Sequence, residues 1–65
     1  MSDTGIDHPR ADEALIRAAI ELFGRSGFEA VGTRALCERA GVNLAAIRYH
    51  FDGKDGLYRA AVQHV

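Results

Sequence analysis

The stretch TRALCERAGVNLAAIRYHF, residues 33–51, decides the fold of this chain because two short helical patterns in it flank a single glycine. Apolar residues at helical spacing predict a first helix over about 33–40. Gly41 ends this helix, since glycine takes the positive φ of a tight turn without steric cost. Asn43 then suits the N-cap of a second helix, over about 44–50. The stretch therefore predicts two short helices joined by a tight turn.

The small and apolar side chains of this stretch fit a helix-turn-helix. A small residue is needed where two such helices cross closely, and Cys37 occupies that place. We expect it to be a small core residue and not a nucleophile. Apolar residues that could pin both helices against a third are Leu36, Ala40, Val42 and Ile47. We predict a helix-turn-helix motif over about 32–51.

Two further helices are predicted on either side of the motif. The earlier one runs over about 10–25, with Pro9 in its first turn and Gly27 in the left-handed position after its end. One face of it repeats at helical spacing through Ile16, Ala19, Ile20 and Phe23. The later one, over about 54–64, has no stop signal, so we expect the chain to be one piece of a larger protein.

The predicted fold is all-α, because no stretch shows the period of two that strands require. It consists of a three-helix, homeodomain-like core followed by the start of a fourth, linking helix, together over residues 10–65. Residues 1–9 lack periodicity and are expected to form a flexible arm. The residues expected to be largely buried are Ile16, Ile20, Phe23, Leu36, Ala40, Val42, Ile47 and Phe51.

The composition limits what so short a chain can do. Its 65 residues form at most one small domain, and 48% hydrophobic with 26% charged residues is typical of a globular protein. The single cysteine forms no internal disulfide, and the histidines show no metal-ligand spacing, so we expect no bound metal. The polar, acidic beginning is unlike a signal peptide, and no apolar run reaches membrane-spanning length. These features predict a cytoplasmic protein that has no membrane partner.

The net charge of −1 conceals an uneven distribution. Residues 1–32 carry three arginines against six carboxylates, whereas residues 33–65 carry five lysines and arginines against three carboxylates. The second half is therefore the basic one, and it permits a polyanionic partner.

Patterns typical of enzymes fail on inspection. The sequence GRSGF, residues 24–28, lacks the second glycine of a nucleophile elbow. The segment 24–33 lacks the Gly-Lys pair of a phosphate-binding loop, and no carboxylate pair has a cleft to hold it. We expect no enzymatic activity and no cofactor.

The sequence AAIELFGRSGFEAVGTRALCERAGVNLAAIRYHFDGKDGLYRAAV resembles the N-terminal DNA-binding domain of the TetR family of bacterial transcriptional repressors. The resemblance covers residues 10–65, and the motif YHF-x-GK-x-x-LY is most similar to that of the CecR-like branch. The residues that carry it are Phe23, Gly27, Phe28, Thr33, Arg34, Ala40, Gly41, Val42, Tyr49, His50, Phe51, Lys54 and Leu57.

The resemblance implies which residues meet DNA. The third helix would enter the major groove and place nearest the base edges Asn43, Leu44, Ala45 and Ala46. Thr33 and Arg34 correspond to family positions that touch phosphate and sometimes a base. In the family, residues at the positions of Arg48, Tyr49 and His50 typically contact the DNA backbone. Lys54, at the start of the fourth helix, would meet phosphate.

The resemblance also implies partners outside this chain. Members of the family carry a C-terminal helical domain that binds a small-molecule effector and forms a homodimer, and that domain is absent here. The implied function is sequence-specific binding of a palindromic DNA operator by a ligand-responsive repressor. The alternative is a helical protein-interaction module that does not bind DNA.

Two departures from the family pattern and several plainer interpretations bear on these roles. Many members have Tyr at the place of Arg48, and the helix that starts at Thr33 lacks a capping box, so its cap should be weak. Tyr49 could instead cover the edge of the core, and His50 could be a helix C-terminal cation that satisfies carbonyls. Arg39 is expected to be solvated.

Overall fold

The computed structural model describes residues 11–64, which form four helices. In chain order they are α1 (Ala11–Ser26), α2 (Thr33–Ala40), α3 (Ala45–Phe51) and α4 (Lys54–His64). The described range contains no strand, so the predicted all-α class is confirmed. The predicted helix bounds agree with the observed ones to within one residue at each described end. The predicted arm, residues 1–9, lies outside the described residues.

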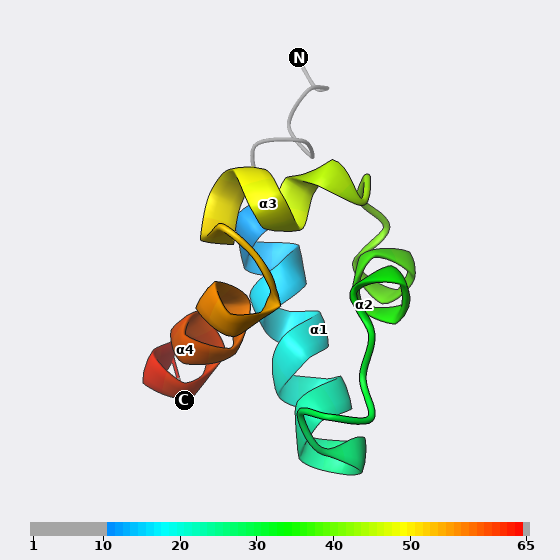
Figure 1. Cartoon of the computed structure of the whole chain (residues 1–65), viewed down its shortest axis with the longest axis vertical. Coiled ribbons are helices and arrows are strands. Elements are labelled where there is room, and N and C mark those ends of the chain that lie inside the picture. The colour runs from blue at the N-terminus through cyan, green and yellow to red at the C-terminus, as the bar shows by residue number, and fades with distance from the viewer. Residues whose placement is uncertain (1–10, 65) are drawn as a thin grey trace.

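Helix α1 is the central element of the fold, and it contacts each of the other three helices. In Figure 1, α3 crosses the beginning of α1 at the top of the molecule, while α2 and α4 lie on opposite sides of α1. This arrangement leaves the outward side of α3 uncovered by any other helix of the described part. No helix in residues 11–64 has the length and apolar character needed to cross a membrane.

The centre of the core contains one fully buried leucine from each of three helices. Leu15 of α1, Leu36 of α2 and Leu57 of α4 are each 0% exposed. Ile47 is the buried residue of α3 and joins the same cluster. Burial of such a side chain contributes about 1.5–3 kcal/mol relative to exposure, so these residues fix the relative positions of the four helices.

The predicted core is only partly confirmed. Phe23, Leu36 and Ile47 are buried as expected. Five others that were expected to be largely buried are only partly buried and pack around the core: Ile16, Ile20, Ala40, Val42 and Phe51.

The buried face of α1 is rotated relative to the predicted one, and its centre is Leu15, Ala18 and Ala19. The reason is that α1 has neighbours on two sides. On one side Ala18 shares a surface hollow with residues of α2, and on the other Ala19 and Ile20 share one with residues of α4. The most buried positions lie between these two contacts, and the small alanines there let the neighbouring helices approach closely.

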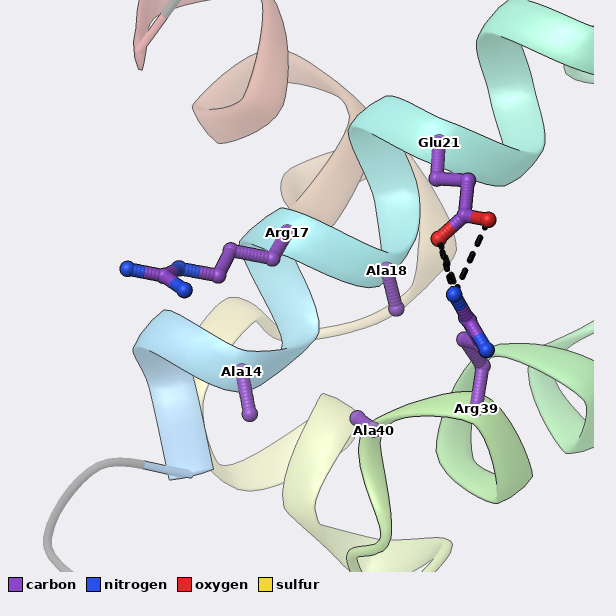
Figure 2. Close-up of a pocket in the computed structure, with 6 residues that line it drawn as sticks. All are labelled: Ala14, Arg17, Ala18, Glu21, Arg39 and Ala40. Atoms are coloured by element: carbon purple, nitrogen blue, oxygen red, sulfur yellow. Dashed lines mark hydrogen bonds and ion pairs between the residues drawn. The ribbon is translucent and has the colours of Figure 1, made fainter.

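Arg39 is not simply solvated, as the sequence had suggested, because it joins α2 to α1. Its guanidinium donates to both carboxylate oxygens of Glu21, with Nη2–Oε1 and Nη2–Oε2 distances of 2.7 and 3.0 Å (Figure 2). Arg25 lies 3.7 Å from the same carboxylate. Both arginine side chains are more than half exposed, so each pair is expected to contribute less than about 1 kcal/mol to stability.

The turn between α3 and α4 brings the two backbones into close contact. Asp52 ends α3 in the left-handed conformation, with φ 65°, and its N–H donates to the carbonyl oxygen of Arg48 at 3.0 Å. Gly56, in the first turn of α4, then passes directly beside the backbone carbonyl of Phe51, so that a Cβ at this position would overlap the carbonyl oxygen. The contact between the helices therefore requires glycine at position 56.

We expect Gly56→Ala to lower the free energy of unfolding by about 2–3 kcal/mol, because backbone must move to admit the methyl group. The matched control is Gly24→Ala in α1, where an added Cβ meets nothing within 4 Å. That change should be neutral or stabilise the chain by up to about 1 kcal/mol, since alanine favours the helix. Urea unfolding followed by circular dichroism measures both. Equal effects of the two substitutions would contradict the proposed close contact.

Candidate nucleic-acid interface

The turn between α2 and α3 is closed by two hydrogen bonds to one carbonyl. Gly41 is left-handed, with φ 73° and ψ 34°, as the sequence predicted. The N–H groups of Gly41 and Val42 both donate to the carbonyl oxygen of Cys37, at 2.8 and 3.0 Å. These bonds fix the direction in which the chain leaves α2, and hence the placement of α3.

Cys37 lies where α2 meets this turn, in the place expected for a small core residue. Its side chain is buried, and Sγ lies 3.5 Å from the carbonyl oxygen of Asn43, to which the thiol can donate. Burial raises the pKa of the Cys37 thiol, so the group stays protonated at neutral pH. A buried, protonated thiol agrees with a packing role and not with a nucleophilic one.

Asn43 supplies the capping interaction at the start of α3. Its side-chain Oδ1 accepts a hydrogen bond from the N–H of Ala45 at 2.9 Å, and its carbonyl oxygen accepts one from Ala46 at 2.9 Å. Leu44, which precedes the first residue of α3, already has helical φ and ψ of −57° and −34°. Asn43 therefore caps the first turn as predicted, although the residue directly before α3 is Leu44, which makes no side-chain capping bond. The amide NH₂ of Asn43 remains as the group that could contact a ligand.

The beginning of α3 presents an apolar tip beside the beginning of α2. Leu44 is 51% exposed, Ala45 is exposed and Ala46 is half-buried. Leu44 and Arg34 line one shallow surface hollow of about 280 Å³, together with Cys37, Glu38 and Val42. The start of α2 has Gly32 as its N-cap and no side-chain capping bond, as expected from the missing capping box.

The last turn of α3 carries exposed polar side chains. Arg48 and His50 are exposed, and Tyr49 is 84% exposed. The interpretation in which Tyr49 covers the edge of the core is therefore wrong. Its ring instead lies edge-on to that of His50, with the centroids 4.9 Å apart. His50 is a basic residue of the last turn of α3, so the role of a C-terminal cation remains open to it.

Three basic side chains in this region have no carboxylate partner. Within residues 11–64, no ion pair involves Arg34, Arg48 or Lys54. Arg39, by contrast, is held by Glu21. The unpaired cations belong to the first turn of α2, the last turn of α3 and the first turn of α4, so their charge is available to an external anion.

Lys54 makes a contact that the sequence did not predict. Its ammonium lies 4.2 Å from the centroid of the Phe28 ring, in cation–π geometry. Phe28 precedes α2 and is half-buried. The sequence does not show whether an aromatic residue before α2 is buried or exposes one face of its ring. The contact between Lys54 and Phe28 could therefore not be predicted from it.

The predicted contact residues fall into two groups, one around the beginning of α3 and one at the end of α3 and the start of α4. Around the apolar tip lie Thr33, Arg34, Asn43, Leu44, Ala45 and Ala46. Beyond it lie Arg48, Tyr49 and His50 of α3 and Lys54 of α4. An exposed helix with an apolar beginning and basic residues beside it can enter a groove and contact the anionic rim. Among residues 11–64, no cluster of three or more potential ligands could hold a metal ion.

Known proteins resemble this chain over most of its length. The family described as bacterial regulatory proteins, tetR family, matches residues 15–61. The HTH-type transcriptional regulatory protein RaaS of Mycobacterium tuberculosis is 56% identical over 50 residues, which are 77% of this chain and 23% of that protein. The dual regulator CecR of Shigella flexneri is 43% identical over 56 residues, or 86% of this chain and 25% of the relative.

The tetracycline repressor protein class C of Escherichia coli is 43% identical over 51 residues, 78% of this chain and 23% of that protein. The chain thus spans about a quarter of the length of these curated relatives. No solved structure matches it. The family match covers the whole helix-turn-helix and most of both flanking helices, and the chain therefore belongs to the tetR family of bacterial regulatory proteins.

Proposed function

We propose that this chain is the DNA-binding domain of a transcriptional regulator and that it inserts α3 into the major groove of duplex DNA. The observation that carries this proposal is the exposed apolar tip of α3, with unpaired basic residues on both sides of it. The curated relatives support it, because those described above are named as transcriptional regulators or as a repressor. These names describe a class of proteins that act without catalysis.

The residues divide between positioning and reading. Arg48, Tyr49, His50 and Lys54 contact phosphates and fix the orientation of the domain, which carries no sequence information by itself. Leu44, Ala45 and Ala46 lie near base edges and offer only apolar surface to them. Hydrogen-bonded reading of bases therefore depends on the amide NH₂ of Asn43 and on Arg34, with Thr33 on the adjoining phosphate.

The larger protein is proposed by likeness to the relatives, of which this chain spans about a quarter. We propose a cytoplasmic, ligand-responsive repressor in which a C-terminal domain forms a homodimer and binds a small effector. Two copies of the helix-turn-helix then read a palindromic operator, since the two-fold symmetry of the protein is repeated in the site.

Arg48→Ala should weaken binding to all duplex sequences by a similar factor and lower the slope of log affinity against log salt by about one, because one phosphate contact is lost. The matched control is Arg25→Ala, which removes the same charge from the far end of α1 (Figure 1) and should leave the slope unchanged. Fluorescence anisotropy over a salt series on a random and a selected duplex measures both. Arg48→Ala would contradict the role if it changed the preferred sequence at constant slope.

The same salt series separates DNA binding from the protein-interaction alternative. A domain that binds through phosphates loses affinity steeply as salt rises, whereas docking of apolar helices depends little on salt. If the unsubstituted chain showed no salt-dependent association with duplex DNA, the proposed function would be wrong.

The apolar tip predicts that thymine methyl groups contribute to base recognition. In a duplex selected from a random library, replacing thymine by deoxyuridine should weaken binding about four-fold at one or two positions of each half-site. A methyl group buried on apolar surface contributes about 0.8 kcal/mol, which gives this factor. Leu44→Ala should abolish the difference between thymine and deoxyuridine at one of these positions. Full sensitivity to deoxyuridine in Leu44→Ala would show that another residue reads the methyl group.

We expect residues 1–65 alone to bind a palindromic site weakly, through two independent half-site events. A single module of this size buries only about 600–1,000 Å² against DNA. Fusion to a dimerising coiled coil of suitable length should tighten binding to the same site by about 10²- to 10⁴-fold, because the second half-site then binds intramolecularly. Cooperative, nanomolar binding by the unfused chain, measured by gel shift, would instead place a dimer contact within these residues.

A further inference from the structure

The ring of Phe28 is held in a fixed orientation by two other aromatic rings. Its centroid lies 5.5 Å from that of Phe23 in α1 and 5.0 Å from that of Tyr58 in α4, the latter in edge-to-face geometry. Phe23 and Tyr58 also contact each other, with centroids 5.3 Å apart. The three rings form a closed triangle in which each restrains the other two. Phe28 is therefore a rigid platform, although it lies in the connection between two helices.

The Phe28 ring contacts one cation, the ammonium of Lys54. Lys54 and Tyr58 are four residues apart on α4, so they share a face of that helix, and Phe28 contacts both. The ammonium of Lys54 lies 4.2 Å from the Phe28 centroid, and no carboxylate in residues 11–64 pairs with it. A lysine side chain normally samples many rotamers, and restraining it beforehand removes part of the entropy lost on binding.

The nature of the restraint matters for an anionic partner. A carboxylate that held Lys54 would neutralise it and compete with phosphate. An aromatic face attracts the ammonium through the ring quadrupole while adding no negative charge. The ammonium thus stays cationic and can direct N–H donors to a phosphate while it rests on the ring. Lys54 also begins α4, an eleven-residue helix whose first backbone N–H groups favour an anion at the same place.

We propose that Phe28 is a positioning residue for DNA binding, which holds the Lys54 ammonium where it meets a backbone phosphate. This inference rests on the proposed function and adds to it a residue outside the helix-turn-helix. Phe28 itself does not contact DNA. Its effect acts through Lys54 and is electrostatic, so it should depend on the electron density of the ring and not on its shape.

Progressive fluorination of the ring tests this directly, because fluorine withdraws electron density from the aromatic face while nearly preserving its shape. The 65-residue chain can be assembled by chemical synthesis with mono-, di- or trifluorophenylalanine at position 28. Affinity for one duplex DNA should fall with each added fluorine, to about two- to five-fold below that of the unsubstituted chain. The salt slope should stay constant, since Lys54 still reaches the phosphate. Thermal unfolding of each variant gives the folded fraction by which its affinity is corrected.

Two controls separate positioning from packing. In a Lys54→Gln background the fluorination series should be flat, because the cation on which the ring acts is gone. The same series at Phe23, which belongs to the same ring cluster but has no cation of residues 11–64 over it, should also be flat. A flat series at Phe28 with Lys54 present, or a decline that persists in Lys54→Gln, would overturn the positioning role.

An NMR measurement on the free chain examines the contact without DNA. The ε-methylene protons of Lys54 should be shifted upfield by the Phe28 ring current, and Phe28→Leu should return them to the usual lysine position. An unshifted signal in the unsubstituted chain would overturn the proposal.

If the shift is present but the chain binds no duplex DNA at low salt, the proposed function fails, and the positioning role fails with it. A flat fluorination series in a chain that binds DNA overturns the positioning role alone.

Discussion

The presentation of α3 depends on the carbonyl group of Cys37, which accepts hydrogen bonds from both Gly41 and Val42. Two N–H groups converging on one acceptor require the left-handed conformation at Gly41, which side chains with a Cβ rarely adopt. Cys37 also has a buried side chain, and its thiol is directed at the carbonyl oxygen of Asn43, just before α3. Backbone and side chain of one position thus set the direction of the turn and the approach of the two helices.

A helix as short as α3 is not stable alone, so its position comes from its neighbours. Ile47 anchors it in the core, Asn43 caps its first turn, and Asp52 ends it in a left-handed conformation. Because these restraints act on its inner side and its two ends, the outer side remains open. The close passage of Gly56 beside Phe51 then fixes α4 directly after α3, which places Lys54 next to the end of the exposed helix.

The charges of the chain illustrate why a net value says little about an anionic partner. The chain as a whole is slightly acidic, with a net charge of −1. Glu21 of α1, however, engages Arg25 and Arg39 on the side formed by α1 and α2. The charges of Arg34, Arg48 and Lys54 are not compensated by an ion pair, because no carboxylate of the described part lies within pairing distance of them. The pairing of individual charges is therefore more informative here than their sum.

The sequence by itself determined the helices, the turn at Gly41, the cap at Asn43 and the family, because each depends on residue types at short spacing. It also predicted that Leu36 and Ile47 lie inside. Tertiary structure decided what depends on neighbours distant in the chain. Packing of α1 between α2 and α4 buried Leu15 and Ala18 beside the predicted Ala19 and left Ile16 and Ile20 half-buried. The pairing of Arg39 with Glu21 and of Lys54 with Phe28 joins residues 18 and 26 positions apart. Periodicity describes one helix at a time, so it cannot say which face meets a second neighbour or which cation finds a partner.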